Sequence, residues 1–391
     1  MKKYITRAIA IFILMALCLP SELACVQAAK KEKLNYVALG DSIAAGYGLK
    51  GYIDEFQAKA PKDSYQSQIA KKLGASVVND AITGITSQEL IDLLTSKACD
   101  KELKTADYVT ISIGSNDILG PVIEILGDIF EVEDKEDILG GISEKMGQAD
   151  FLTLVSYVKE LGERFEDNKV LHEAASKFPK KLETILTLVK TKAPNAKIYM
   201  TNSYNPYVCL DSMVLPVGTY TQTYIDELNQ AFTSDSKDYT LIDSCTLFEH
   251  GDCVNVTVDL MNPISSNLDP HPNLKGHKTL ADAFYNAMSK DISETIRKVK
   301  IKSVTSKHAN QITLDYKKQK DADGYTIYYS TKKNGTYKKL KSTTKEKLSI
   351  SSKKLKADTK YYIYIKAYKK FGDEVIYGPE SASKKVRIAV N

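Results

Sequence analysis

The chain alternates short apolar runs with longer segments in which apolar residues recur every three or four positions. Buried strands are predicted at 34–39, 76–79, 106–113, 197–201 and 239–242. Helices are predicted at 63–73, 86–95, 220–232 and 274–297. Strands that alternate with helices favour the α/β class, in which helices cover both faces of a parallel sheet.

One connection in this pattern is oversized. Between 117 and 197 several helical segments are predicted, including 121–130, 151–165 and 171–190, where one crossover helix would suffice. The first of them lies in an unusually apolar stretch, with Ile118, Leu119, Val122, Ile123, Ile125, Leu126, Ile129 and Phe130. Two interpretations stay open: an acyl-chain groove or lid beside a site, or the commoner one of a helix packed into the core.

After Lys298 the period of the pattern changes from about four residues to two. Alternating segments occur at 312–316, 324–329, 348–350 and 361–368, separated by the turn signals Asn334-Gly335 and Phe371-Gly372-Asp373. Such spacing is typical of a β-sandwich. We therefore predict an α/β domain at 30–298 and an all-β domain at 299–391.

The first 29 residues have the pattern of an export signal. Lys2, Lys3 and Arg7 precede an uncharged run from Ala8 to Leu19, and small residues allow cleavage after Ala28 or Ala29. The run is shorter than the ~20 residues of a membrane span. We predict a signal peptide at 1–29 and a secreted, extracellular mature chain without a transmembrane segment.

Charge divides the chain more sharply than its net value of +5 indicates. Residues 298–391 hold 24 Lys/Arg against 8 Asp/Glu, a surplus of +16, and the remainder has a net charge of −11. The basic part also holds 10 of the 24 tyrosines. Anionic cell-wall polymers or polysaccharides are therefore candidate partners, with a solvated spacer as the alternative. Nucleic acid is not expected, because no RNA- or DNA-binding motif is present.

The cysteines of the expected mature chain are Cys99, Cys209, Cys245 and Cys253. An exported chain can form disulfides, and the closely spaced Cys245 and Cys253 are the favoured pair, although sequence leaves the connectivity open. No CxxC motif or Cys/His cluster is present, so no metal site is predicted.

Four short blocks carry residues suited to acyl-transfer chemistry. They are Gly40-Asp41-Ser42, Gly84, Gly114-Ser115-Asn116-Asp117 and Asp269-Pro270-His271-Pro272-Asn273. Each alone is typical of a turn or helix cap, but three follow predicted strands and the fourth precedes the last helix. Together they offer Ser42 as nucleophile and His271 as base. The Ser42 and Gly84 N–H groups and the Asn116 amide offer an oxyanion hole.

In their order and spacing these blocks resemble the SGNH hydrolases, also called the GDSL esterases and lipases, over about residues 36–288. The four marker residues of the family would be Ser42, Gly84, Asn116 and His271. The resemblance implies a three-layer α/β/α, flavodoxin-like fold and a serine esterase or lipase that needs no cofactor. The Gly-Asp-Ser-Ile-Ala sequence at Ser42 is not Gly-x-Ser-x-Gly, which disfavours the α/β-hydrolase fold.

The chain departs from the family at the third member of the triad. The family places its acid three residues before the histidine, where this chain has Leu268; Asp269 is only two residues before His271. An extended segment would put both side chains on one face. Asp269 is therefore the predicted acid, and a backbone carbonyl near Asn267 is the alternative partner of His271.

The C-terminal part resembles a fibronectin type III domain over about residues 301–388. Residues 355–361, followed by Ile365 and Ala367, fit the pattern around the tyrosine corner of that fold. The usual buried Trp is lacking, and Tyr316 takes its place in the pattern.

The expected function is a secreted hydrolase of acyl or acetyl esters, acting on lipid or acylated carbohydrate; a wall-binding protein or an acyltransferase is the alternative.

Overall fold

The computed structural model describes residues 33–391 except 136, 209–210, 212–215, 249–253 and 259–267. The expected signal peptide lies outside the described residues, and so do Cys209 and Cys253. Export and the Cys245–Cys253 pairing therefore stay predictions. Among the described helices none has the length and apolar character needed to cross a bilayer.

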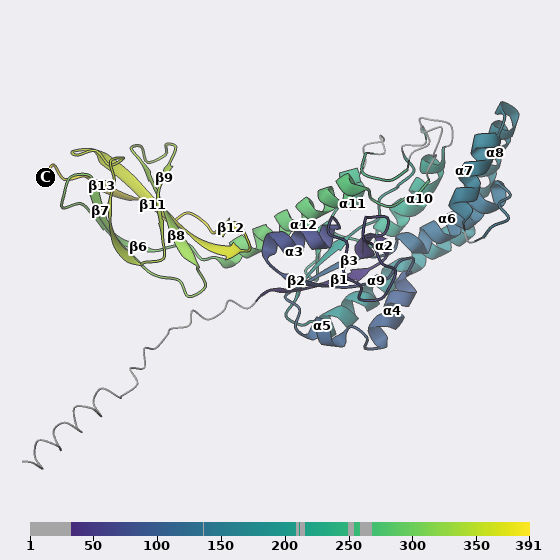
Figure 1. Cartoon of the computed structure of the whole chain (residues 1–391), viewed down its shortest axis with the longest axis horizontal. Coiled ribbons are helices and arrows are strands. Elements are labelled where there is room, and N and C mark those ends of the chain that lie inside the picture. Colours follow the sequence, from purple (N-terminus) through teal and green to yellow (C-terminus); the bar gives the residue numbers. More distant parts are fainter. Residues whose placement is uncertain (1–32, 136, 209–210, 212–215, 249–253, 259–267) are drawn as a thin grey trace, which may run out of the picture. The chain divides into compact units, whose positions relative to one another are not determined.

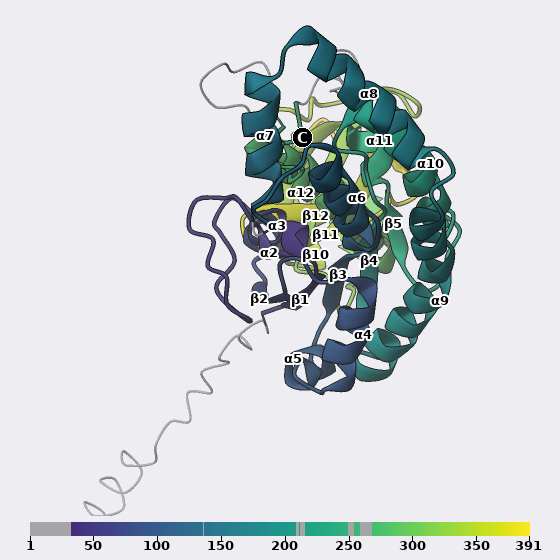
Figure 2. The same cartoon turned by 90° about the vertical axis from the view of Figure 1, so that its right-hand side faces the viewer.

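The first domain is built on a five-stranded parallel sheet in the order β2-β1-β3-β4-β5; Figure 1 shows its first three strands, and Figure 2 labels all five. Its strands are β1 (Asn35–Gly40), β2 (Ser76–Ala81), β3 (Tyr108–Ser112), β4 (Lys197–Thr201) and β5 (Thr240–Ile242). This strand order is the flavodoxin-like one. The predicted parallel sheet and its five strands are confirmed.

Helices cover both faces of the sheet, which confirms the predicted three layers (Figure 2). The helices are α2 (Ser42–Ala45), α3 (Tyr65–Leu73), α4 (Ser87–Thr95), α5 (Asp100–Lys104), α6 (Ser115–Ile129), α7 (Ile138–Gln148), α8 (Phe151–Phe165), α9 (Lys169–Lys192), α10 (Val217–Asn229), α11 (Ser244–Phe248) and α12 (Leu274–Thr295). Helix α3 packs against α12, and α4 packs against α9. The chain moves along the sheet in one direction from β1 to β2, and in the opposite direction from β2 to β3 and on to β5. Right-handed crossovers therefore place α3 and α4 on opposite faces.

The oversized connection contains the four helices α6 to α9, of which α7 had not been named individually in the prediction. The predicted start of the first helix at Pro121 is wrong, because α6 begins at Ser115 and holds Pro121 in its interior. Gly114, in a left-handed conformation with φ of 110°, ends the β3 segment and redirects the chain into the helix. Asn116 consequently lies in the first turn of a helix that begins at the sheet edge.

The C-terminal domain consists of two antiparallel sheets, with the strand orders β10-β7-β6 and β12-β11-β8-β9, and with β13 paired to β11. The strands are β6 (Ile301–Thr305), β7 (Gln311–Tyr316), β8 (Gly324–Ser330), β9 (Lys338–Thr343), β10 (Lys347–Ser351), β11 (Lys360–Phe371), β12 (Glu374–Tyr377) and β13 (Lys384–Arg387). Their facing side chains form one core that includes Ile312, Tyr316, Ile327 and Ile365. The predicted all-β sandwich is confirmed, and β6, β9, β12 and β13 were not predicted.

Candidate active site

Ser42 lies at the edge of the sheet where the strand order reverses. It follows β1, and Asn116 follows the neighbouring strand β3, so both lie at the crevice where flavodoxin-like folds hold their ligands. A Cβ at Gly40, whose φ is 124°, would lie 1.9 Å from the Ser112 carbonyl oxygen. Only glycine therefore allows this close approach of the chain leaving β1 to β3.

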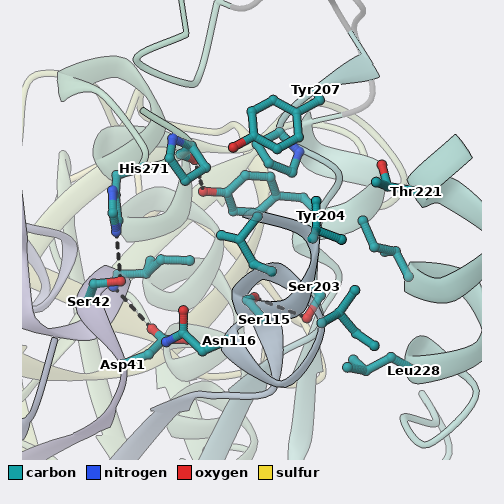
Figure 3. A pocket seen from close by; sticks show the side chains of 17 residues that line it. Asp41, Ser42, Ser115, Asn116, Ser203, Tyr204, Tyr207, Thr221, Leu228 and His271 are labelled. Atoms are coloured by element: carbon teal, nitrogen blue, oxygen red, sulfur yellow. Dashed lines mark hydrogen bonds between the residues drawn. The ribbon is translucent and has the colours of Figure 1, made fainter. Parts of the chain in front are cut away.

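The structure brings Ser42, His271 and Asp269 together from two distant parts of the sequence. The Ser42 Oγ lies 2.8 Å from His271 Nε2 (Figure 3), and His271 Nδ1 lies 2.5 Å from Asp269 Oδ1. The order hydroxyl, imidazole, carboxylate is the arrangement in which a histidine can take a proton from serine and a carboxylate can orient the histidine.

A turn within the Asp269–His271 segment explains how a spacing of two residues suffices. The same oxygen, Asp269 Oδ1, accepts hydrogen bonds from the backbone N–H of His271, at 2.9 Å, and from its ring. Burial opposes ionisation of Asp269, but the hydrogen bonds from His271 and its charge outweigh burial and lower the pKa of the carboxyl below its usual value. The alternative partner near Asn267 lies outside the described residues.

Two buried tyrosines hold the segment that carries the acid and the base. The Tyr204 hydroxyl donates to the Pro270 carbonyl at 2.8 Å, and the Tyr207 hydroxyl donates to the Leu268 carbonyl at 3.4 Å. On the other side, the backbone and hydroxyl of Thr257 donate to the His271 carbonyl at 2.9 and 3.0 Å. These donors fix the backbone on both sides of Asp269, which keeps its carboxylate beside the imidazole.

Gly84 and Asn116 are brought to the same edge as Ser42. Asn116 donates one amide N–H to the carbonyl of Ile85 at 3.0 Å, which joins the first turn of α6 to the loop after β2. An amide carries two such donors, so the second stays available to a substrate. Gly84 has a φ of 78°, and the space where a Cβ would lie is empty, so its backbone is open to an approaching carbonyl group.

Asp117 anchors this part of the site without contributing to its chemistry. Its buried carboxylate accepts from the backbone and hydroxyl of Ser87, at 2.9 and 2.6 Å, and from Lys181 Nζ at 2.8 Å. These contacts join the first turns of α6 and α4 to α9. They fix the helix start that presents Asn116.

An apolar pocket opens beside Ser42 and His271, with about 600 Å³ of empty space when the part open to solvent is included. Figure 3 shows it extending from these two residues toward Thr221 and Leu228. Its apolar walls come from α2, α6, α10 and the loop after β4, namely Ile43, Ile118, Leu119, Val122, Pro206, Tyr207, Ile225 and Leu228. Its hydroxyls are mostly bonded internally: Ser115 to Ser203 at 3.1 Å, and Thr221 to the Val217 carbonyl at 2.7 Å. The pocket therefore suits an alkyl chain better than a sugar.

The apolar stretch at the start of the oversized connection partly lines the pocket and partly packs into the core. Ile118, Leu119 and Val122 line the pocket. Leu126, Ile129 and Phe130 are buried in the core of the domain, where the Phe130 ring lies 4.3 Å from that of Tyr157. Helix α6 therefore lines the pocket with its first turns and packs into the core farther along.

Asp41, next to the serine, is almost completely buried and only partly satisfied. Its Oδ1 accepts from the Ser112 hydroxyl at 3.0 Å and from the Ile43 backbone at 3.1 Å, which caps α2. Its Oδ2 has no hydrogen-bond partner among the described residues. Burial raises the pKa of this carboxyl from 3.8 to about 6, more than its hydrogen bonds and the His271 charge lower it.

The Asp41→Asn variant should lose the pH dependence of stability that the Asp41 carboxyl causes. Because the folded-state pKa is raised, the folded protein binds the proton more tightly, and the stability due to this group falls as pH rises from about 4 to above 6. The shift corresponds to at most about 3 kcal/mol. An asparagine at this position cannot ionise. In urea unfolding at pH 4.5 and pH 8, the stability of the variant relative to wild type should therefore increase with pH; a difference that does not change with pH would contradict the buried carboxylate.

No group of His, Cys, Asp and Glu side chains among the described residues has the arrangement of a metal site. Sequence reasoning missed Tyr204, Tyr207 and Thr257, which hold the catalytic segment. A tyrosine more than 60 positions from its acceptor gives no local signal, so only the fold could reveal these contacts.

Most of the first domain matches a known protein family. Residues 38–279 match the GDSL-like Lipase/Acylhydrolase family. The chain is 26% identical over 272 residues to YpmR, an uncharacterized protein of Bacillus subtilis strain 168, covering 67% of this chain and 84% of that protein.

Two solved structures are similar to the two domains in turn. The lipase Lip_vut3 from a goat rumen metagenome covers 65% of this chain and 97% of its own, at 18% identity and a TM-score of 0.42. An Fn3-like protein from Clostridium thermocellum covers 23% of this chain and 88% of its own, at 19% identity and a TM-score of 0.19. The family match spans more than half of the chain, and it confirms the family that the four sequence blocks predicted. The chain is a serine ester hydrolase and belongs to the GDSL-like lipase/acylhydrolase family.

Proposed function

We propose that this chain is an exported esterase that hydrolyses acyl esters through an acyl intermediate on Ser42. The observation that carries the proposal is the hydrogen-bonded series Ser42, His271 and Asp269 at the mouth of an apolar pocket. A hydrolase of lipid-like esters needs both parts, a nucleophile with its base and an apolar space for the leaving or retained chain.

The reaction proceeds in two steps that use the same groups. His271 Nε2 takes the Ser42 proton as Oγ attacks the ester carbonyl, and the Ser42 and Gly84 N–H groups with the Asn116 amide stabilise the oxyanion. The C–O bond breaks, and His271 returns the proton to the departing alcohol. Water, deprotonated by His271, then attacks the acyl-Ser42. The bond between the acyl carbon and Ser42 Oγ breaks, the carboxylic acid leaves, and His271 returns the proton to Oγ. Asp269 stabilises the imidazolium in both steps.

The substrate we favour is an ester of a fatty acyl chain. The pocket beside Ser42 is walled mainly by apolar side chains, and the hydroxyls of Ser115, Ser203 and Thr221 bond to one another or to the backbone. An acetyl group would leave most of this apolar surface in contact with water, whereas a longer chain would cover it. Acetylated polysaccharide is therefore the weaker candidate.

Location and partner complete the proposal. The pattern of residues 1–29 supports export, and the surplus of +16 in residues 298–391 supports association with anionic polymers of a cell wall. An enzyme held there would stay near esters carried by the envelope.

A panel of nitrophenyl esters tests the acyl specificity. Wild-type kcat/KM should be higher for butyryl and octanoyl esters than for acetyl esters or acetylated xylan. Leu119→Phe fills part of the pocket, so it should lower kcat/KM for the octanoyl ester by about tenfold while changing the acetyl ester less than about threefold. Ile123→Phe, on the same helix but outside the pocket lining, is the matched control and should change neither. Equal losses on both esters in Leu119→Phe would contradict an acyl site in this pocket.

A further inference from the structure

The outer face of the larger C-terminal sheet carries tyrosines where a solvent-facing sheet surface is ordinarily polar. Along β8 and β11 the side chains alternate, and Ile327, Ile363 and Ile365 point into the sandwich core. The intervening positions face outward. Among them, Tyr328 and Tyr364 lie directly opposite each other in the strand register.

Six tyrosines form one group on this side of the sheet, which we call the tyrosine face: Tyr328, Tyr337, Tyr362, Tyr364, Tyr368 and Tyr377. The Tyr364 ring lies 4.9 Å from that of Tyr328 and 4.6 Å from that of Tyr337. The Tyr368 and Tyr377 rings are 5.7 Å apart. These contacts hold the rings in place before any ligand arrives, so the face is preorganised for binding.

Lysines surround the tyrosine face. Lys339 pairs with Tyr328 in the register of β8 and β9, and the ammonium groups of Lys360 and Lys366 each lie 5.9 Å from a ring centroid, those of Tyr362 and Tyr364. Two carboxylates lie among these groups: Glu380 is ion-paired with Lys366 at 3.0 Å and accepts a hydrogen bond from the Tyr364 hydroxyl, and Asp323 lies near Tyr368. The face thus combines fixed aromatic rings with a surplus of positive charge.

We propose that the tyrosine face binds an acidic polysaccharide. Pyranose rings present C–H surfaces that pack on aromatic rings and hydroxyls that bond to tyrosine hydroxyls, while carboxylates on the sugar pair with the lysines. Tyr364 is 8% exposed because its neighbours cover its ring. The half-buried rings of Tyr328, Tyr337 and Tyr362 are the ones on which a sugar can pack, and the buried Tyr364 ring packs against the first two. The proposal deepens the polymer-binding part of the proposed function and rests on it.

Affinity electrophoresis of the full-length protein through gels containing polygalacturonate tests the surface. Wild type should be retarded at low salt and released as screening increases, and neutral dextran should not retard it. The triple variant Tyr328→Thr, Tyr337→Ser, Tyr362→Thr keeps β-forming residues on the strands and should weaken binding by about tenfold or more. Lys339→Glu, at an exposed side chain, is a second variant that leaves the ring packing intact and should weaken binding by about fivefold.

The matched control removes charge elsewhere in the same domain. Lys317→Gln, Lys318→Gln and Lys320→Gln together alter three exposed lysines of the β7–β8 connection and should weaken binding by no more than about threefold. An equal or larger loss in this control would overturn the proposal in favour of binding by overall charge. Tighter binding of single-stranded DNA than of polygalacturonate would overturn the ligand class.

Ester hydrolysis is measured on the same proteins with a soluble butyryl ester. The variants of the tyrosine face should retain wild-type turnover, since none of their residues touches the active site. Loss of polymer binding with intact hydrolysis locates the defect on the tyrosine face. Absence of hydrolysis in wild type would refute the esterase assignment and leave the binding result standing.

Discussion

Replacing Ser42 with alanine is expected to lower kcat for ester hydrolysis by on the order of 10⁶-fold, the loss that a serine protease suffers without its nucleophile. The reason is the contact between Ser42 Oγ and His271 Nε2 at 2.8 Å. Without the hydroxyl no acyl intermediate can form, and the oxyanion donors alone give only a small residual acceleration. Steady-state hydrolysis of a soluble butyryl ester measures the effect.

The fold should survive this change, which makes the kinetic result interpretable. The cap of α2 comes from Asp41, and the first turn of that helix does not depend on the serine hydroxyl. The thermal midpoint of Ser42→Ala should therefore stay within a few degrees of wild type, as for a substitution that creates no cavity. A folded Ser42→Ala protein with more than a few per cent of wild-type activity would place the nucleophile elsewhere.

The general position of the site was predictable because parallel strands bring their carboxyl ends to one edge. Gly40-Asp41-Ser42 follows β1 and Gly114-Ser115-Asn116 follows β3, and these two strands are neighbours in the sheet. Local pattern therefore indicated both the chemistry and the location of these residues. The predicted strands at 34–39 and 106–113 differ from β1 and β3 by at most two residues at each end.

The support around the site was not predictable from local pattern. Tyr204 and Tyr207 follow β4 and donate to carbonyls more than 60 positions later, and Thr257 reaches His271 from another loop. Hydropathy and turn signals describe neighbours in sequence, whereas these contacts depend on how the loops fold over the sheet edge. Likewise, the start of α6 at Ser115 was hidden by Pro121, a residue that ordinarily marks the first turn of a helix.

Removing the carboxylate of Asp269 is expected to have the second-largest effect. Asp269→Ala should lower kcat by about 10³- to 10⁴-fold, since the loss of the equivalent aspartate function in a serine protease costs about 10⁴. Its Oδ1 is the acceptor for both the ring and the backbone N–H of His271. Without it the imidazole loses its orientation and its partner charge. His271→Ala is the reference for complete loss of the base.

Asp269→Asn should be less damaging than Asp269→Ala, for a reason specific to this turn. The backbone N–H of His271 points at Oδ1 from 2.9 Å, so an asparagine there gains a hydrogen bond only by presenting its oxygen. That oxygen also accepts from ring Nδ1–H, which keeps Nε2 free to take the Ser42 proton. The variant then loses the charge but keeps the tautomer, and a charge-assisted hydrogen bond of about 1.5–3 kcal/mol corresponds to a loss of about 10- to 150-fold.

The ratio of the kcat values of the two variants, measured on the same ester, separates the effect of the His271 ring orientation from that of the Asp269 charge. A loss in Asp269→Asn as large as in Asp269→Ala would mean that the amide has turned its NH₂ group toward the ring, at the cost of leaving the His271 N–H without its acceptor. A loss of less than about tenfold in Asp269→Ala, or about 1.4 kcal/mol, would instead reduce the triad to a Ser42–His271 dyad. We expect the large loss, because the donors from Tyr204 and Thr257 hold the backbone of this segment in the conformation that places the Asp269 carboxylate beside the His271 ring.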